Sequence, residues 1–355
     1  MALSPELRIG IGKRAGLTAG LLGMLCVPAE LCFLLPDLLV TRDALPLYKA
    51  HIGVFRGILQ ASIFATFALG TLGVALLMGG SEAEPLDIGA PRAFSAGLDY
   101  FVLELLVLGL VFVPLEGLFP LRAQRVLREG WQTDLKHFFV SHAGVQLLSF
   151  AVLIPAQVLF AWAVQLDFQR AVAAQPLWLQ FVEIVAAVDL ATYGIHRAFH
   201  QVPWLWSFHA IHHSSLKMDW IAGSRIHPVD AVVTRAVAYL PVFVLGFAPP
   251  ALYAYLVFLS FHTVFIHANV RWRFPYLRWA ISTPEYHHWH HTSDEEGIDK
   301  NFASVLPLWD LAFGTAHQPD HWPKNYGTVK FQPPETYIGQ LLYPFRRKGE
   351  ATPYG

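Results

Sequence analysis

The chain has 355 residues, with 25 Lys and Arg against 26 Asp and Glu, and a formal net charge of -1 at pH 7. This balance argues against a basic surface for nucleic acid. Charged residues make up 14% of the chain and hydrophobic residues 54%, whereas soluble domains average about 25% charged residues. The composition therefore excludes a disordered chain and makes a soluble globule a poor fit.

Seven apolar runs are candidates for membrane helices, because a helix needs about 20 apolar residues to cross the hydrocarbon and satisfies its own backbone there. The sixth and seventh runs are short and are joined by a Gly- and Pro-containing turn, which predicts a hairpin. The sequence thus predicts an all-α integral membrane protein. The runs cover residues 15–40, 54–79, 98–120, 138–166, 176–195, 231–247 and 250–267.

The orientation of these helices follows from their loops, since Lys and Arg concentrate on the cytoplasmic side of a membrane. Loop 121–137 contains three Arg and one Lys, whereas loops 80–97 and 167–175 contain one Arg each. Counting the later crossings from loop 121–137 places every His-rich segment on the cytoplasmic face. The Pro-rich region after residue 268 is expected to form a cytoplasmic cap on that face.

Histidine is unevenly distributed, because twelve of the 17 His lie between His196 and His291. His196 and His200 are four residues apart, so one helical face can present both to one metal ion. Two later segments have the spacing H-x-x-H-H, which puts three more imidazoles on a single turn, too many for one ion. The spacing therefore predicts two metals. These segments contain His209, His212 and His213, and His287, His290 and His291.

The residue types around these segments narrow the kind of metal site. Imidazole suits Fe, Zn, Cu and Ni, and neither Cys lies near the His segments, which argues against an iron–sulfur cluster. Carboxylate-type di-iron bundles need a Glu-x-x-His on each of two helices, and no such pair is present. We predict a site made mostly of His. The isolated residues His51, His137 and His142 are expected to be satisfied polar groups. Four other His residues remain unassigned, namely His262, His288, His317 and His321.

From about Asp189 to Thr315 the sequence resembles the fatty acid hydroxylase and sterol desaturase superfamily of integral membrane di-iron oxygenases. The matching motifs are Asp189-x-x-x-Tyr193-x-x-His196-Arg197-x-x-His200, His209-x-x-His212-His213-Ser214, Arg225-x-His227-Pro228, His267-x-Asn269, His287-x-x-His290-His291, Asn301, and Trp309-Asp310 with Gly314-Thr315.

The resemblance implies a transmembrane helical bundle with a cytosolic His-rich helical cap that holds two iron ions, with zinc able to replace iron in recombinant protein. Asp189 and Asn301 would lie behind the ligands, since a ligating His usually passes its other N–H to a carboxylate or carbonyl. His227 would be an additional ligand or a group behind the ligands. The implied metal-binding and catalytic residues are His196, His200, His209, His212, His213, His267, His287, His290 and His291.

The resemblance also divides the chain into three expected parts. Residues 1–97 are N-terminal membrane helices of unassigned role, residues 98–320 form the hydroxylase-like catalytic domain, and residues 321–355 form a C-terminal cytoplasmic tail. The aromatic residues Trp272, Trp279 and Trp289 are expected at the membrane interface or in the wall of the substrate site.

The implied activity is O₂-dependent oxidation of an unactivated lipid C–H bond, with O₂ as co-substrate and the lipid supplied by the bilayer. Hydroxylation and desaturation both remain open, as do sterol, fatty acyl and other lipid substrates. The sequence contains no Rossmann fingerprint or haem module, so electrons are expected from an external ferredoxin or cytochrome with its reductase.

Two other classes of function fit the sequence less well. A zinc-dependent membrane lipid hydrolase should contain H-E-x-x-H, which this sequence lacks. A metal transporter or haem electron carrier should place His along a path within facing membrane helices, whereas most His here follow the ends of the apolar runs.

Overall fold

The computed structural model describes residues 98–140 and 157–346. The chain divides into two compact units after Pro120. The first unit contributes one described helix, α3 (Leu98–Leu118), which matches the predicted run 98–120. All elements discussed below belong to the second unit.

The second unit is helical, and the described residues contain no strand. Three long helices are accompanied by short helices and 3-10 turns, three of which contain six of the His residues. The elements are η3 (Ala161–Ala163), α5 (Leu166–Ala173), α6 (Leu177–Gln201), α7 (Pro203–His209), η4 (His212–Ser214), η5 (Ala222–Ser224), α8 (Pro228–Leu245), α9 (Pro249–His267), α10 (Pro284–His290), η6 (Glu295–Gly297), α11 (Leu308–Phe313) and α12 (Tyr337–Arg346).

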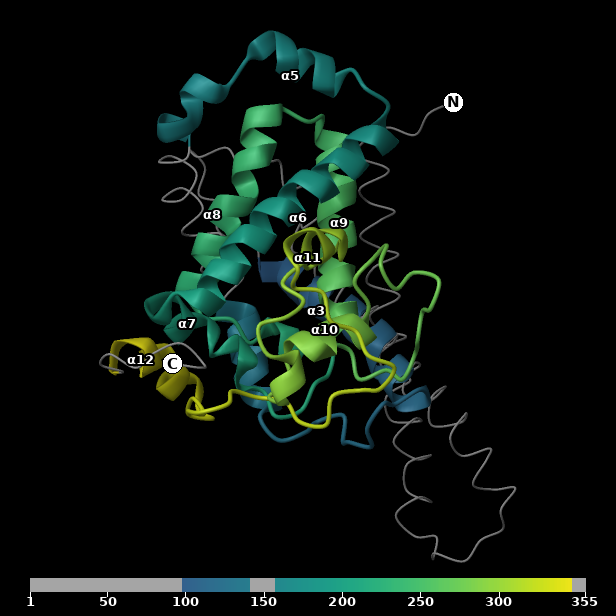
Figure 1. Ribbon diagram of the computed structural model, residues 1–355, viewed down its shortest axis with the longest axis vertical. Coiled ribbons are helices and arrows are strands. Elements are labelled where there is room, and N and C mark those ends of the chain that lie inside the picture. The colour runs from purple at the N-terminus through teal and green to yellow at the C-terminus, as the bar shows by residue number, and fades with distance from the viewer. Residues whose placement is uncertain (1–97, 141–156, 347–355) are drawn as a thin grey trace, which may run out of the picture. The chain divides into compact units, whose positions relative to one another are not determined.

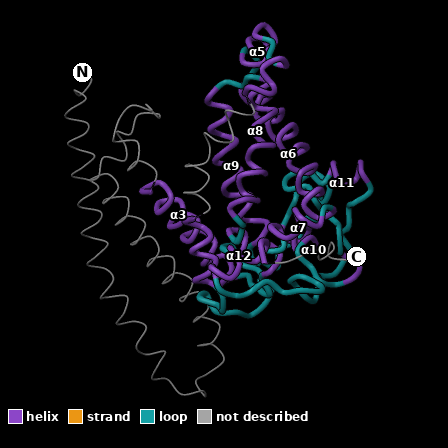
Figure 2. Tube along the Cα trace, turned by 90° about the vertical axis from the view of Figure 1, so that its left-hand side faces the viewer, coloured by secondary structure: helices purple, strands orange, loops and turns teal. Residues whose placement is uncertain are grey.

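Helices α6, α8 and α9 form the central bundle of this unit (Figures 1 and 2), with α6 packed against both of the others. The core between α6 and α9 is apolar, with Ile184 and Val188 of α6 packed near Ala251 and Tyr255 of α9. Between helices that lie in lipid, such contacts stabilise the bundle through van der Waals packing. Helices α7, α10 and α12 gather at the end of the bundle where α6 and α9 finish, and α5 lies at the opposite end (Figures 1 and 2).

Proline and glycine set the helix boundaries. Helices α7, α8, α9 and α10 each begin with Pro at the first or second position, where its fixed φ favours the helix and its missing N–H is not needed. Helix α8 ends at Gly246, which has φ +74. Glycine adopts this left-handed conformation without strain, and the chain then turns into Pro249.

Helices α6, α8 and α9 are each long and apolar enough to cross a membrane. They correspond to the predicted runs 176–195, 231–247 and 250–267, and the predicted hairpin between the last two is confirmed. Helix α6 continues past its apolar run to Gln201, so His196 and His200 lie in its last two turns. The predicted loop 167–175 is largely helix α5.

The remaining predicted runs lie wholly or partly outside the described residues. Runs 15–40 and 54–79 fall outside, as do residues 141–156 of run 138–166, whose flanks at 131–140 and 157–160 are helical.

The turn that joins α8 and α9 provides a test of this fold. We expect Gly246→Ala to lower the melting temperature of the purified protein, because a left-handed non-glycine residue costs about 1–2 kcal/mol. The new Cβ would also lie 2.5 Å from the side chain of Gln169, which donates to the Phe243 carbonyl at 2.8 Å. Gly194→Ala is the control, because its Cβ meets nothing within 4 Å. Equal melting temperatures for the two variants would contradict this account of the turn.

Candidate metal centre

Nine imidazoles from four short stretches of chain form two adjacent groups. In each group the potential ligand atoms all lie within 4.8 Å of one another, and the side chains are buried. The structure therefore brings together nine of the ten His predicted for the site. The five-histidine group consists of His196, His200, His209, His213 and His290, and the four-histidine group consists of His212, His267, His287 and His291.

Each H-x-x-H-H segment contributes to both groups. In the first, His209 and His213 join the five-histidine group while His212 points into the other. In the second, His287 and His291 join the four-histidine group while His290 points into the other. In each segment the first and third His are four residues apart and lie on one face of the turn, whereas the second His is rotated away from that face. Each segment therefore links the two groups.

The spacing of the ring nitrogens fits bound metal ions. The Nε2 atoms of His196 and His209 are 3.0 Å apart, and that of His267 lies 3.0 Å from His287 and 3.1 Å from His291. Two nitrogens about 2.1 Å from one metal, at right angles, lie about 3.0 Å from each other. Buried Nε2 atoms of His200, His213 and His290 have no hydrogen-bond partner among the described residues, so a cation is the partner that this donor set suits.

Four of the imidazoles that lie outside the long apolar helices are held in the neutral form that a metal requires. Burial, and then the neighbouring imidazoles, keep the pKa values of His212, His213, His287 and His291 well below their usual range. A neutral imidazole has one free lone pair and can act as a ligand.

Four of the five imidazoles in the five-histidine group donate through Nδ1 to a fixed acceptor. His209 donates to the Asp230 carboxylate at 2.7 Å and His200 to Asp299 at 3.1 Å. His196 donates to the Phe302 carbonyl at 2.7 Å, and His290 donates to the Lys300 carbonyl at 2.8 Å. These bonds place the proton on Nδ1 and leave Nε2 free to face the centre of the group.

Three of those acceptors come from one segment, residues 299–302. The Asp299 side chain accepts from His200. The Lys300 carbonyl accepts from His290, and the Phe302 carbonyl accepts from His196. Asp299 and Asn301 have φ angles of +54 and +59, a conformation that Asp and Asn tolerate better than other non-glycine residues. The two left-handed residues allow this short segment to turn its acceptors toward the same group.

Two buried carboxylates hold the chain that follows this segment. Asp310 accepts from the backbone N–H of Phe302 and Ala303 at 2.8 Å each. Asp189 accepts from the next three N–H groups, those of residues 304–306, at 2.7 to 3.1 Å. Five consecutive backbone donors are thus bound by two side chains, one from α6 and one from α11. This arrangement fixes the Phe302 carbonyl that orients His196.

Asp310 has further partners inside the protein. It accepts from the Tyr286 hydroxyl at 2.9 Å and from the Thr315 hydroxyl at 2.6 Å. The Thr315 hydroxyl in turn lies 2.9 Å from the Tyr193 hydroxyl. The network therefore connects α6, α10 and α11 behind the five-histidine group.

The four-histidine group is held through backbone carbonyls. His212 donates to the Arg225 carbonyl at 3.2 Å, and His267 donates to the Thr263 carbonyl at 2.6 Å. Arg225 itself is fixed by a buried ion pair with Asp134 at 2.5 Å. Asp134 and Asp219 both bind Arg128, at 2.7 Å each. Each charge in this network faces an opposite charge, which a buried ion needs.

The predicted auxiliary residues take other places. His227 lies outside both groups and caps α8, with Nδ1 accepting from Val229 N at 3.1 Å and Nε2 donating to the Leu341 carbonyl at 3.2 Å. Asp189 binds backbone N–H groups rather than an imidazole. The Asn301 side chain donates to the Tyr286 carbonyl at 2.9 Å and accepts from His317 N at 2.7 Å.

The carboxylate partners of the imidazoles were missed by sequence reasoning. Asp230 lies in the first turn of α8, 21 residues from its partner His209. Asp299 lies 99 residues from His200. The resemblance motifs contain Asp189, Asn301 and Asp310 but neither Asp230 nor Asp299.

The other His residues in the described part of the chain lie outside both groups. His137 contacts Gln340 and the Ile226 carbonyl at 2.7 and 3.1 Å. His262 contacts the Ser304 carbonyl at 3.1 Å, and His288 lies 2.7 Å from the Tyr326 hydroxyl. Trp289 is fully buried and is therefore part of the core rather than the membrane interface.

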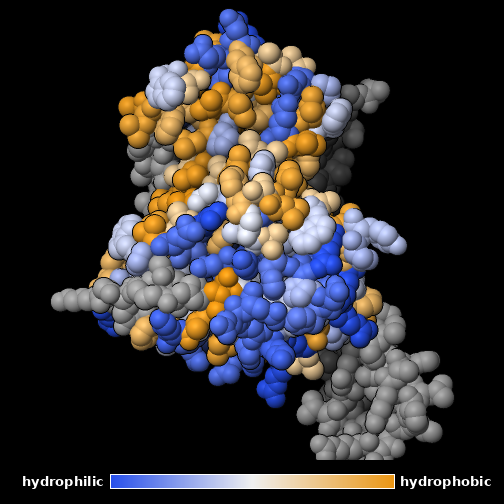
Figure 3. All heavy atoms as spheres, in the orientation of Figure 1, coloured by the Kyte–Doolittle hydropathy of each residue, from blue (hydrophilic) through white to orange (hydrophobic). Residues whose placement is uncertain are grey.

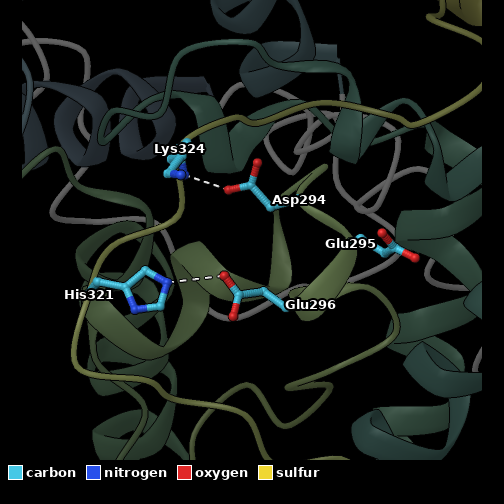
Figure 4. A pocket seen from close by; sticks show the side chains of 5 residues that line it. All are labelled: Asp294, Glu295, Glu296, His321 and Lys324. Carbon is cyan, nitrogen blue, oxygen red and sulfur yellow. Dashed lines mark hydrogen bonds and ion pairs between the residues drawn. The ribbon is translucent and has the colours of Figure 1, made fainter.

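A small open depression of about 310 Å³ lies on the surface of the unit and is drawn in Figure 4. It is lined by Asp294, Glu295, Glu296, His321 and Lys324. Asp294 accepts from the backbone N–H of Lys324 at 2.5 Å, and Glu296 lies 3.0 Å from His321. Glu295 points away from the other side chains in Figure 4. These contacts join the turn at η6 to the segment 321–325.

Comparison with known proteins identifies the class to which this centre belongs. Residues 181–315 match the fatty acid hydroxylase family, and this range contains all nine clustered His. The segment therefore belongs to the fatty acid hydroxylase superfamily, as its motifs predicted.

Curated relatives include an ornithine lipid hydroxylase OlsE of Rhizobium tropici, 28% identical over 61% of this chain and 66% of that protein. The alkylglycerol monooxygenase of Homo sapiens is 36% identical over 36% of this chain and 28% of its own length. The very-long-chain aldehyde decarbonylase GL1-1 of Oryza sativa subsp. indica is 31% identical over 37% of this chain and 22% of its own length. The chain thus spans less than two thirds of each relative, and no solved structure matches it.

Asp310 provides the test of the scaffold behind the His groups. We expect Asp310→Asn to lower the melting temperature strongly, because an amide nitrogen cannot accept from the buried donors that one carboxylate oxygen now binds. Hydrogen bonds to charged groups contribute about 1.5–3 kcal/mol each. Asp320→Asn is the matched control, because the Asp320 side chain is 93% exposed. A variant at Asp310 that melts like the control would show that the network does not hold the segment.

Proposed function

We propose that this protein is a membrane-embedded, O₂-dependent di-iron oxidoreductase that hydroxylates or desaturates a C–H bond of a membrane lipid. The observation that supports this proposal most directly is the pair of buried histidine groups within the segment that matches the fatty acid hydroxylase family. The names of two relatives, a hydroxylase and a monooxygenase, favour hydroxylation. We therefore propose insertion of one oxygen atom as the main reaction.

In this proposal the five-histidine group holds one iron and the four-histidine group holds the other. Neutral imidazoles suit iron, and zinc can occupy such a site in recombinant protein. His227 has no ligand role, because both of its ring nitrogens already have partners. Bound iron supplies the activation of O₂ and the oxidising power for hydrogen abstraction.

The chain's own residues orient the ligands and exclude water. Asp230 and Asp299 stand behind His209 and His200, and a carboxylate behind an imidazole makes it a stronger electron donor. The four-histidine group has carbonyl acceptors at His212 and His267 instead. The first site is therefore the more electron-rich of the two, and burial of both limits wasteful reaction with bulk water.

The reaction needs electrons from outside the protein. Hydroxylation consumes one C–H bond, O₂, two electrons and two protons, and yields one C–OH group and one water molecule. The sequence contains no dinucleotide fingerprint, so the proposed donor is an external ferredoxin or cytochrome with its reductase. In this proposal the lipid enters from the bilayer and the centre lies on the cytoplasmic face, which the distribution of Lys and Arg supports.

Loss of one ligand from each group tests the two-metal assignment. We expect His290→Ala and His212→Ala each to lower the iron content of the protein from about two ions per chain toward one and to abolish turnover, because each removes a ligand from a different group. Iron content is measured by elemental analysis and the sites by Mössbauer spectroscopy of ⁵⁷Fe-loaded protein. His321→Ala, in an exposed residue outside both groups, should retain both irons. Full iron and activity in either ligand variant would refute the assignment, and a haem absorption band would favour an electron carrier.

Lipid mass spectrometry tests the reaction itself. Protein in nanodiscs made from total cell lipid, supplied with ferredoxin, ferredoxin reductase, NADPH and O₂, should convert one lipid class to a product heavier by one oxygen atom. The same mixture without ferredoxin should give no product, because two electrons cannot be delivered. A product lighter by two hydrogens would replace hydroxylation with desaturation. Turnover with NADPH alone would contradict the external donor.

A further inference from the structure

Helix α11 presents an uncharged, apolar face outside the hydrophobic core. Leu308, Leu311 and Phe313 are each about half exposed, at 53%, 47% and 52%. The only charged residue of the helix, Asp310, points inward and is fully buried. A helix that faces water normally places charged or polar side chains on its outer face. The outer face of α11 has none.

The contacts of α11 fix its position along α6. Just before α11, Leu306 N donates to Asp189 of α6 at 2.7 Å. At its other end, the ring of Phe313 stacks on Tyr193 of α6 with centroids 5.1 Å apart. Helix α11 therefore lies beside residues 189–193 of a helix long and apolar enough to cross a membrane.

The aromatic residues at the far end of α6 give the depth of this position. Trp178, in the first turn of α6, is 69% exposed, and exposed Trp is typical of a membrane interface. A hydrocarbon core of about 30 Å corresponds to about 20 helical residues. Measured from Trp178, that core extends beyond Tyr193. The residues of α6 that contact α11 thus lie inside the hydrocarbon or at its edge.

We infer that the outer face of α11 is a lipid-binding surface, inserted among phospholipid acyl chains at the edge of the bilayer. The region after residue 268, predicted from its composition as a cytoplasmic cap, thus includes a segment that enters the membrane. In Figure 3 the hydrophobic surface over α11 continues into that of the long helices, with hydrophilic surface on the other side. A soluble protein partner fits this face poorly, since α11 offers it no charged side chain.

The position of this surface gives it a connection to the metal centre. The inner side of α11 carries Asp310, which binds the backbone of Phe302 at 2.8 Å, and the Phe302 carbonyl accepts from His196. A single short helix therefore separates the bilayer from the segment that orients the five-histidine group. The inference itself rests on the membrane-spanning helices and stands apart from the proposed reaction.

Site-directed spin labelling tests the lipid contact. The two native Cys are replaced by Ser, and single labels are attached through Leu311→Cys and, on the same face, Leu308→Cys. Glu295→Cys is the control, because Glu295 is exposed and lines the small open depression drawn in Figure 4. Each protein is placed in phosphatidylcholine nanodiscs, and power-saturation EPR measures the collision of the label with O₂, which concentrates in lipid, and with nickel-EDDA, which stays in water.

We expect labels at positions 311 and 308 to collide several-fold more with O₂ than with nickel-EDDA, and the label at 295 to show the reverse. Greater collision with nickel-EDDA at 311 and 308 would place α11 in water and overturn the inference. Low collision with both reagents would show that protein covers the face, either a second copy or a partner, and would also overturn it. Two labelled positions keep the test decisive if one variant fails to fold.

Discussion

The structure depends on gathering nine imidazoles into two adjacent buried groups. Several Nε2 atoms lie about 3 Å from one another, where their lone pairs repel unless a cation lies between them. Burial keeps the pKa values of His212, His213, His287 and His291 well below their usual range. A ring that is to bind a metal must also be held in the tautomer that leaves Nε2 free. For six of the nine rings the surrounding protein supplies that control through acceptors for Nδ1–H. The fold around the site is largely a scaffold for those acceptors.

That scaffold is mostly backbone, and its rigidity comes from buried carboxylates that do not touch the imidazoles. Asp189 and Asp310 bind the N–H groups of residues 302–306, and the Phe302 carbonyl then orients His196. A buried carboxylate is costly unless it is fully hydrogen-bonded, and here each accepts at least three bonds. These hydrogen bonds offset the cost of burying the two charges. They also fix a segment that has little regular structure of its own. On the other side of the centre, Arg225 is fixed in the same way by Asp134.

The ligands could be predicted from the sequence because their spacing is local, whereas the outer layer could not because its contacts are distant. The i, i+3 and i+4 spacings indicated two metals, but the assignment of His212 and His213 to different groups depends on a small rotation set by packing. Asp230 and Asp299 lie far from their partners along the chain and have no local pattern. The motif containing His227 predicted an additional ligand or a group behind the ligands, and the structure gives its ring nitrogens the Val229 N–H and the Leu341 carbonyl as partners. The three long apolar helices followed from composition alone, and α6 extends beyond its predicted run to Gln201.

In the C-terminal region, composition did not indicate which apolar residues face the protein core and which face lipid. A short helix such as α11 contains too few residues for an apolar run, so its content of Leu and Phe is equally consistent with a core and with a lipid-facing surface. The distinction comes from its contacts with Asp189 and Tyr193, which give the position of α11 along a membrane-spanning helix. The same contacts bring the backbone of residues 302–306 to the level of the bilayer edge. Because His196 is only three residues beyond Tyr193 on α6, the histidine groups lie about one helical turn further on. A lipid whose polar head stays at the interface would therefore need to move little to present a carbon near its head to the histidine groups.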